Sequence, residues 1–218
     1  MAKSKILDIL IIGAGGHAQV VADILKLNDK TYRVIGYIDE KESLHDQKIL
    51  DIPVLGSSEK IADIQHDGVI VAIGDNQLRS RIYSELVDNG EFFVNAIHPE
   101  AIVADQVSIG CGVVVCAGVI INPGAIIHNN VILNTGCSVD HHNIIHDHVH
   151  LAPGSVLGGD VIIKEGTLIG IGSTVLPQKI IGAWSSIGAG AVVTDNIPEH
   201  VTAVGIPAAI NKPIPEEG

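Results

Sequence analysis

Residues 103–139 read VADQVS IGCGVV VCAGVI INPGAI IHNNVI LNTGCS V when the sequence is divided every six residues. The first residue of each block is Val, Ile or Leu, and the same spacing continues to Val193. A period of six matches neither the 3.6-residue turn of an α-helix nor the two-residue alternation of a strand. The sixteen consecutive aliphatic positions are Val103, Ile109, Val115, Ile121, Ile127, Leu133, Val139, Ile145, Leu151, Leu157, Ile163, Ile169, Val175, Ile181, Ile187 and Val193.

This period means that one residue in six meets the same environment at every repeat. Three short strands per coil form a triangular prism whose aliphatic side chains point inward, and residues three repeats apart stack on successive coils. The corner three residues after each aliphatic residue requires a positive φ, which glycine and asparagine tolerate. We therefore expect a parallel β-helix of about five coils, with corners at Gly112, Gly118, Gly124, Asn130, Gly136, Gly154, Gly166, Gly172 and Gly190.

The composition agrees with a narrow interior. Hydrophobic residues make up 46% of the 218 residues, but Trp, Tyr and Phe together make up only 3%, as expected for a core of stacked Val and Ile. The formal charge of −12 argues against nucleic acid as a general partner, because such partners require a basic surface. No apolar run approaches the length of about 18 residues that a bilayer requires, so we expect no membrane insertion.

The N-terminus, MAKSKILDILIIGAGG, has a basic start, but its apolar part ends in a glycine loop without a small-residue cleavage site. We interpret it as a first strand rather than a signal peptide, which predicts a cytoplasmic protein. Cys111, Cys116 and Cys137 lack CxxC spacing, and we expect them to be small core residues in a reducing compartment.

Residues 1–98 follow another pattern, in which short apolar runs alternate with amphipathic segments such as HAQVVADILKLN and NQLRSRIYSELVDNG. This alternation predicts an α/β unit, a Rossmann-like half-unit. The expected second domain, residues 99–218, contains the β-helix and a C-terminal tail. The chain is thus predicted to have two domains.

The segment Gly13-Ala14-Gly15-Gly16-His17-Ala18 follows the first expected strand, opens a helix and fits GxGxxG/A, and Asp39 ends the second strand. Such a loop holds the pyrophosphate of a dinucleotide, holds the diphosphate of a nucleotide-linked sugar, or is only a tight turn. A full dinucleotide fold needs two such halves, and fewer than 100 residues precede the repeat. The length therefore favours the nucleotide sugar.

Six of the eleven histidines lie between His128 and His150. A metal site would use His146, His148 and His150, although a corner interrupts their alternation and no Cys or carboxylate cluster completes a ligand set. Surface or intersubunit hydrogen bonding would instead explain His128, His146 and His148. A third possibility is a general base in acyl transfer, since imidazole has an ordinary pKa near about 6.5.

Residues one coil apart also outline a groove along the prism, suited to a long pantetheine arm. Pro153, Ile171 and Ala189 form one such column. The next column contains only glycines, which allow close approach or merely turn corners: Gly154, Gly172 and Gly190.

The repeats SIGCGV, TLIGIG and SIGAGAVV, together with GAGGHA, NTGCSVDHH and VGIPAA, carry a family resemblance. The chain resembles the bacterial nucleotide-sugar N-acetyltransferases and sialic-acid O-acetyltransferases, a branch of the hexapeptide-repeat acyltransferases. The resemblance implies a left-handed β-helix, a homotrimer, and acetyl-CoA as cosubstrate without a metal. It also implies active sites between subunits.

The resemblance assigns residues to three roles. His141 matches the catalytic base, whereas His142 stands where those enzymes carry Glu, so His142 either orients the base or only fills space. The positions that match contacts to the nucleotide sugar are Gly15, Gly16, His17, Asp39, Glu40 and Gly74. Those near acetyl-CoA are His150, Ile171 and Ala189.

These observations together predict an acetyl-CoA-dependent N-acetyltransferase that acts on a nucleotide-linked amino sugar, such as a 4-amino-deoxy sugar. Its product would serve surface-glycan biosynthesis, including the O-antigen of lipopolysaccharide. Two alternatives stay open. One is O-acetylation of sialic acid or a related sugar, and the other is a prism that acts only as a scaffold.

Overall fold

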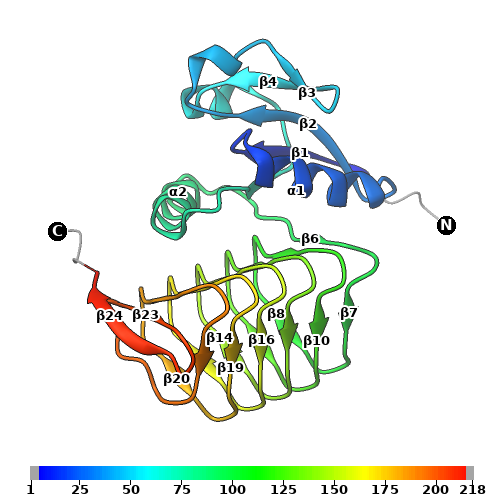
Figure 1. Cartoon of the computed structure of the whole chain (residues 1–218). Coiled ribbons are helices and arrows are strands. Elements are labelled where there is room, and N and C mark those ends of the chain that lie inside the picture. Colours follow the sequence, from blue (N-terminus) through cyan, green and yellow to red (C-terminus); the bar gives the residue numbers. More distant parts are fainter. Residues whose placement is uncertain (1–4, 215–218) are drawn as a thin grey trace. The chain divides into compact units, whose positions relative to one another are not determined.

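The computed structural model describes residues 5–214. Its contacts divide the chain into two compact units, residues 1–99 and residues 100–218. The first unit contains two long helices and a small sheet, and the second is a stack of very short strands (Figure 1).

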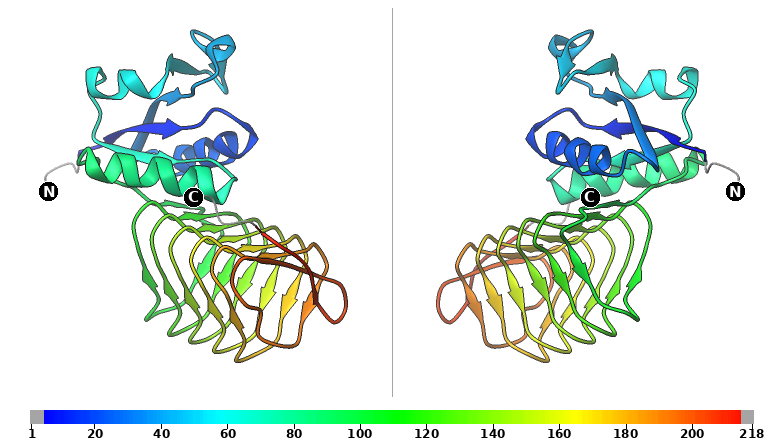
Figure 2. Two further views of the ribbon diagram at one scale, coloured as in Figure 1. Left: turned by 90° about the vertical axis from the view of Figure 1, so that its left-hand side faces the viewer. Right: turned by 90° about the vertical axis from the view of Figure 1, so that its right-hand side faces the viewer.

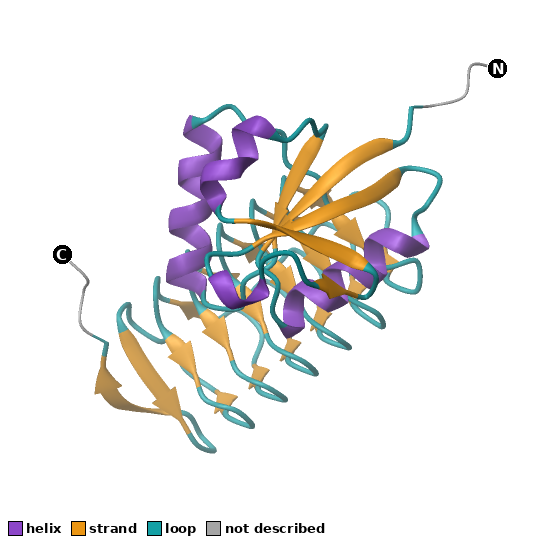
Figure 3. Cartoon of the chain, turned by 90° about the horizontal axis from the view of Figure 1, so that it is seen from above, coloured by secondary structure: helices purple, strands orange, loops and turns teal. Residues whose placement is uncertain are grey.

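The sheet of the first unit has the order β3-β4-β2-β1-β5. All its pairings are parallel except that of β3 with β4. Helices flank its twisted strands (Figure 3), as the alternation of apolar runs and amphipathic segments predicts. The strands are β1 (Leu7–Ile12), β2 (Tyr32–Ile38), β3 (Lys48–Ile49), β4 (Ile52–Gly56) and β5 (Gly68–Val71); the helical segments are α1 (Gly16–Leu27), η1 (Glu42–Leu44), η2 (Ser58–Asp63) and α2 (Asn76–Asp88).

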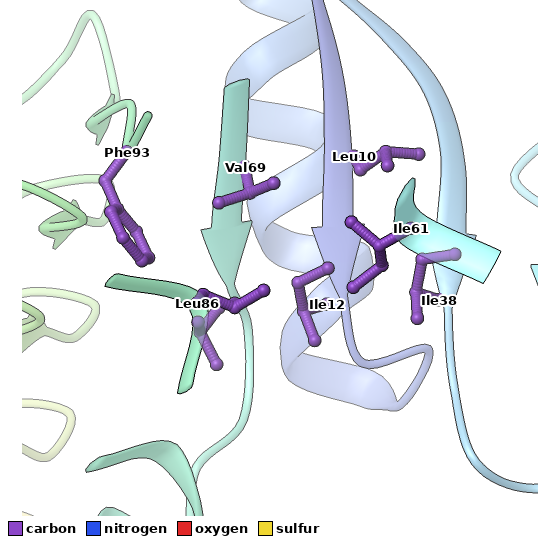
Figure 4. Close-up of a cluster of buried hydrophobic side chains, with 8 residues drawn as sticks. Leu10, Ile12, Ile38, Ile61, Val69, Leu86 and Phe93 are labelled. Atoms are coloured by element: carbon purple, nitrogen blue, oxygen red, sulfur yellow. The ribbon is translucent and has the colours of Figure 1, made fainter. Parts of the chain in front are cut away.

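One face of this sheet packs on a cluster of aliphatic side chains. Leu10 and Ile12 of β1 lie at its centre, with residues of the neighbouring strands beside them and Leu86 of α2 against them (Figure 4). The Phe93 ring closes the cluster and lies 4.2 Å, between ring centroids, from the Tyr83 ring. The central parallel strands therefore pack on a buried hydrophobic cluster, which holds their carboxyl ends in place.

The second unit is the left-handed parallel β-helix that the family resemblance implied, with one coil stacked on the next (Figure 2). Each short strand pairs in parallel with its counterpart in the adjacent coil, for example Ile126 with Ile144. The first face contains β7 (Ile102–Val103), β10 (Ile120–Ile121), β13 (Ser138–Val139), β16 (Val156–Leu157), β19 (Thr174–Val175) and β22 (Val192–Val193); the second contains β8 (Ser108–Ile109), β11 (Ile126–Ile127), β14 (Ile144–Ile145), β17 (Ile162–Ile163) and β20 (Ile180–Ile181); the third contains β9 (Val114–Val115), β12 (Ile132–Leu133), β15 (His150–Leu151), β18 (Leu168–Ile169) and β21 (Ser186–Ile187).

The interior is the predicted aliphatic stack. Of the sixteen positions, only Val103 and Ile109, which belong to the first coil, are not buried. All nine predicted corners have a positive φ, between 54° and 76°. Six further corners occur at the same spacing but carry larger side chains than Gly or Asn: Gln106, His142, His148, Asp160, Gln178 and Trp184.

The cysteine prediction was wrong at one position. Cys116 and Cys137 are buried, whereas Cys111 is exposed. Cys111 lies two residues after Ile109, just before the corner at Gly112, where the chain turns and the side chain faces outward. A small residue at such a position does not indicate a core position.

The prism is followed by a hairpin of β23 (Val201–Val204) and β24 (Ala209–Pro213), which pair antiparallel. The first unit ends with β6 (Ala96–Ile97). Between residues 5 and 214, no helix is both long and apolar enough to cross a membrane.

Candidate functional site

A large cavity of about 1120 Å³ lies at the carboxyl ends of the strands of the first unit. Its walls are the glycine loop after β1, the end of β2, the first turns of η2 and one side of α2. All six residues predicted to contact a nucleotide sugar line this cavity: Gly15, Gly16, His17, Asp39, Glu40 and Gly74.

The glycine loop is shaped to leave backbone amides accessible. At Gly13, which has a φ of 105°, a Cβ would lie 3.1 Å from the carbonyl oxygen of Ala72. At Gly15 and Gly16 a Cβ would meet nothing within 4 Å, so the space above them is open. Because α1 begins at Gly16, the positive end of the helix dipole faces this space. The loop is therefore suited to an anionic group such as a diphosphate.

The two predicted acidic residues hold the rim of the cavity. The Asp39 carboxylate accepts hydrogen bonds from the Ala14 N–H at 2.8 Å and the Lys41 N–H at 2.9 Å. The Glu40 carboxylate accepts from the Ser58 N–H at 2.9 Å, and these bonds from Ser58 lower the pKa of Glu40. Both carboxylates are thus fixed in place and keep oxygen lone pairs for a ligand.

Sequence reasoning missed Arg79, which is fully buried in α2. Its Nη1 donates to the carbonyl oxygens of Ile73 at 3.0 Å and Gly74 at 3.4 Å, which fixes the turn after β5. Burial lowers the pKa of Arg79 to about 9. Helical spacing was the available signal, because Arg79 shares the face of Ile82 and Leu86.

His17 lies beside this buried cation. Burial first, and then the charge of Arg79, lower its pKa to about 4. The imidazole is therefore neutral at neutral pH, so it carries a single N–H and no positive charge. The loop amides, the helix terminus and Arg81, which also lines the cavity, are then the groups that can attract a phosphate.

In the prism, His141 and His142 form a contacting pair. Their Nδ1 atoms lie 3.1 Å apart and their rings meet edge to face, with centroids 5.3 Å apart. Both side chains are exposed, and His142 occupies a corner with a φ of 58°. One Nδ1 must donate and the other accept, so the protonation of each ring determines the tautomer of the other.

Each ring rests on a glycine of an adjacent coil. A Cβ at Gly159, one coil after His141, would lie 2.4 Å from Cε1 and 2.5 Å from Nε2 of that ring. A Cβ at Gly124, one coil before His142, would lie 2.7 Å from Cδ2 of that ring. The absence of side chains at these two glycines therefore makes the space that the imidazoles fill.

Asp140, which precedes the pair, directs its carboxylate to Asn122 and to the backbone. Its Oδ1 accepts from Nδ2 of Asn122 and from the backbone N–H of His141, each at 2.8 Å. These bonds, the Asn122 bond first, lower the pKa of Asp140. The carboxylate thus fixes the backbone at His141, and the ring contact belongs to His142.

The other clustered histidines make separate contacts away from this pair. His148 is buried, and its Nδ1 lies 2.8 Å from Nδ2 of Asn130, so the interpretation of His148 as a surface residue was wrong. The His128 and His146 rings stack with centroids 5.1 Å apart. His150 projects from β15, where its Nε2 lies 3.2 Å from Nδ2 of Asn134.

A metal-like grouping does occur, but at other residues. Among residues 5–214, the set of three or more His, Cys, Asp or Glu side chains close enough to share an ion is His141, His142 and Asp160. The alternative metal site at His146, His148 and His150 does not form in this part of the chain.

The predicted acyl-donor columns run along the prism surface. Ile171 is 61% exposed, and Ala189 is exposed one coil further on. In the adjacent column, a Cβ at Gly154, Gly172 or Gly190 would meet nothing within 4 Å. The positive φ at these three positions favours glycine. The glycines also leave the surface beside Ile171 without projecting side chains.

Known proteins are similar to this chain in sequence and overall structure. The family model described as the PglD N-terminal domain matches residues 8–86. A histidine variant of perosamine N-acetyltransferase from Caulobacter crescentus, solved with CoA and GDP-perosamine, aligns with a TM-score of 0.88 and 38% identity, covering 94% of this chain and 97% of that one. The acetyltransferase domain of PglB from Neisseria gonorrhoeae FA1090, in complex with acetyl coenzyme A, aligns with a TM-score of 0.86 and 30% identity, covering 96% and 100%.

Curated sequences agree over a shorter region. UDP-N-acetylbacillosamine N-acetyltransferase of Bacillus subtilis (strain 168) is 37% identical over 112 residues, which are 50% of this chain and 51% of that protein. The alignment thus spans about half the length of this relative, whereas the similarity to the solved structures spans nearly the whole chain.

Proposed function

The chain belongs to the bacterial nucleotide-sugar N-acetyltransferase and sialic-acid O-acetyltransferase family of hexapeptide-repeat acyltransferases, and on this premise we propose that it acetylates the amino group of a nucleotide-linked amino sugar. Acetyl-CoA is the acyl donor, and a 4-amino-deoxy sugar is the acceptor. The reaction takes place in the cytoplasm and supplies surface-glycan biosynthesis, including the O-antigen. The C. crescentus relative supports this acceptor class, since its structure holds GDP-perosamine.

The observation that carries this proposal is the position of the His141 imidazole. Its ring lies against Gly159, and its Nδ1 lies 3.1 Å from Nδ1 of His142. When His141 donates the proton between them, its Nε2 has a free lone pair. An exposed imidazole held in one tautomer by its neighbour is suited to act as a general base.

The sugar amine attacks the thioester carbonyl carbon, and Nε2 of His141 removes a proton from the nitrogen as the C–N bond forms. The tetrahedral intermediate then expels the CoA thiolate as the C–S bond breaks, and the imidazolium returns its proton to sulfur. His142 accepts the Nδ1–H throughout, which keeps the ring oriented.

The cavity of the first unit binds the nucleotide part of the acceptor in this proposal. Gly15 and Gly16 offer amides to the diphosphate, His17 offers a neutral N–H, and Gly74 with the acidic residues Asp39 and Glu40 shapes the remaining wall. The pantetheine arm of acetyl-CoA lies along Ile171 and Ala189, with His150 toward the thioester. The exposure of that column supports this path.

We further propose a homotrimer with its active sites between subunits. An outward ladder of isoleucines on the second prism face supports it, because Ile126 and Ile180 are 41% and 40% exposed and Ile144 and Ile162 pair between them. A continuous aliphatic strip of this kind is normally covered by a partner. A solution mass three times the 22.8 kDa chain mass is expected in sedimentation equilibrium.

Thiol release from acetyl-CoA tests the activity. GDP-, UDP- and dTDP-linked 4-amino sugars are offered in parallel with free sialic acid, and product mass locates the acetyl group. Release with at least one amino-sugar nucleotide is expected. Release with sialic acid alone would replace the proposal by O-acetylation, and release with neither class would favour the scaffold alternative.

The same assay tests the assigned base. His141→Asn is expected to lower kcat about 100-fold or more with little change in the KM of either substrate, because general-base catalysis contributes about 10²–10⁴-fold. His128→Asn is the matched control, since that histidine lies outside the proposed site. Activity of His141→Asn near the wild-type level would remove His141 from this role.

A further inference from the structure

His142 and Asp160 occupy the same corner of successive coils. Both have a φ of 58°, and the Asp160 N–H donates to the His141 carbonyl oxygen at 3.0 Å. One ligand atom from each of His141, His142 and Asp160 lies within 4.8 Å of the other two, and all three side chains are exposed. Two imidazole nitrogens and a carboxylate oxygen therefore converge on one point of the surface.

This donor set is one that zinc prefers. Zn²⁺ binds His nitrogen at roughly 2.0–2.1 Å and carboxylate oxygen at roughly 2.0–2.2 Å in a tetrahedron, so two His ligands of one ion lie about 3.3 Å apart. The Nδ1 atoms of His141 and His142 are 3.1 Å apart. Two of the three ligands thus already have the separation that one zinc ion requires.

The scaffold supports such a site in two further ways. Gly124 and Gly159 leave room for the two rings in their present positions, so little ordering is required on binding. The chain has a formal charge of −12, which raises the local concentration of cations. The exposed Asp160 carboxylate lies close enough to complete the donor set.

We propose that this corner binds one Zn²⁺ ion through Nδ1 of His141, Nδ1 of His142 and a carboxylate oxygen of Asp160, and that bound zinc inhibits acetyl transfer. The inhibition follows from the tautomer. A metal on Nδ1 of a neutral imidazole leaves the ring proton on Nε2, so Nε2 cannot accept a proton from the sugar amine. The inhibition rests on the proposed function, whereas the binding does not.

Binding is measured by isothermal titration of the full, untagged chain with Zn²⁺, and by the visible absorption of the Co²⁺-loaded protein. One ion per chain is expected, with a tetrahedral cobalt spectrum. Asp160→Asn is expected to weaken zinc binding about tenfold or more, because the neutral amide is a poor zinc ligand. Asp105→Asn, which changes an exposed carboxylate of the first coil, is expected to leave it unchanged. No binding by the wild type, or equal binding by Asp160→Asn, would overturn the site.

Inhibition is measured separately by thiol release with and without Zn²⁺ and a chelator. The wild type is expected to lose activity with zinc and regain it with the chelator. Asp160→Asn is expected to keep basal activity within about twofold and to need about tenfold more zinc for half-inhibition. Zinc that binds without inhibiting would overturn the inhibitory role. An enzyme inactive without zinc would instead contradict the proposed function and leave the binding result intact.

Discussion

The Nδ1 atoms of His141 and His142 lie 3.1 Å apart, so the partner of the proposed base is a second imidazole. The enzymes that the chain resembles carry Glu at the position of His142. A carboxylate would stabilise the charged form of the base, whereas a neutral imidazole only accepts its hydrogen bond. The pH dependence of the reaction should therefore reveal which partner is present.

Replacing His142 with Glu tests this difference. A carboxylate beside His141 favours its protonated form, which cannot act as a base. The acid limb of kcat/KM is therefore expected to move to higher pH by about one unit. The measurement is a pH profile between 5 and 9 for wild type, His142→Glu and His142→Asn, where Asn tolerates the positive φ and supplies a neutral acceptor. An acid limb at the same pH in the wild type and His142→Glu would show that position 142 does not act on the base.

Gly159→Ala is expected to displace His141 without unfolding the prism. The added Cβ would lie 2.4 Å from the ring, but the exposed imidazole can swing away at little cost in stability. We expect kcat to fall about tenfold or more, since a misplacement of about 1 Å can cost about 10²-fold. The melting temperature should change little.

A double-mutant cycle checks the cause of that loss. In a His141→Ala background, Gly159→Ala should have no further effect on kcat, because the ring that it displaces is gone. A full additive loss would mean that Gly159 acts through another contact.

The prism could be predicted almost completely from sequence because its repeat is purely local. The aliphatic at every sixth position and the small residue three positions later each follow from one coil, and coils add without new topology. His142 and Asp160 were not predicted as corners because only Gly and Asn were taken as corner residues, although Asp and His also adopt a positive φ more often than most side chains. Their backbone is determined by the coils above and below.

Contacts between side chains that are distant in the sequence could not be predicted from it. The repeat places Gly159 one coil after His141, but only coordinates show that the ring lies over it. Arg79 escaped notice for a related reason, since a charged residue in an amphipathic helix normally faces solvent. Its spacing with Ile82 and Leu86 indicates the apolar face of α2, but only the structure shows the carbonyls of the turn after β5 that accept its hydrogen bonds.

Arg79→Leu should lower the free energy of unfolding of the first unit. The substitution leaves the Ile73 and Gly74 carbonyls without the guanidinium donors, and each unsatisfied buried polar group costs about 1–3 kcal/mol. A loss of about 2–4 kcal/mol is expected in urea denaturation. Arg81→Leu, on an exposed position of the same helix, is the control. Equal losses for the two variants would show that burial of Arg79 is not the cause.

Ile171→Glu is expected to weaken acetyl-CoA binding selectively. Ile171 is exposed in the column proposed for the pantetheine arm, and a carboxylate there repels the anionic cofactor and removes apolar contact. The KM for acetyl-CoA should rise about tenfold, which corresponds to about 1.4 kcal/mol, while the KM for the nucleotide sugar stays the same. Ile171→Val should behave like the wild type. A rise only in the KM for the nucleotide sugar would place the acyl donor elsewhere.

His17 should make the first unit less stable as the pH falls. Its folded pKa of about 4 is below the unfolded value of 6.5, because burial and Arg79 disfavour the imidazolium. Between these two values the unfolded chain binds more protons, so the free energy of unfolding decreases as pH decreases from 6.5 and levels off below about 4. The full difference is on the order of 3 kcal/mol.

Urea denaturation of wild type and His17→Gln at several pH values between 4 and 7 measures this contribution. Glutamine does not titrate, so the wild type should lose more stability than the variant across this window, and the two curves should run parallel above pH 7. His146, whose pKa burial also lowers, stays in both proteins and cancels in the difference. Curves that are parallel through the whole window would mean that His17 is protonated as readily in the folded state as in the unfolded chain, and the neutral N–H assigned to it in the cavity would have to be given up.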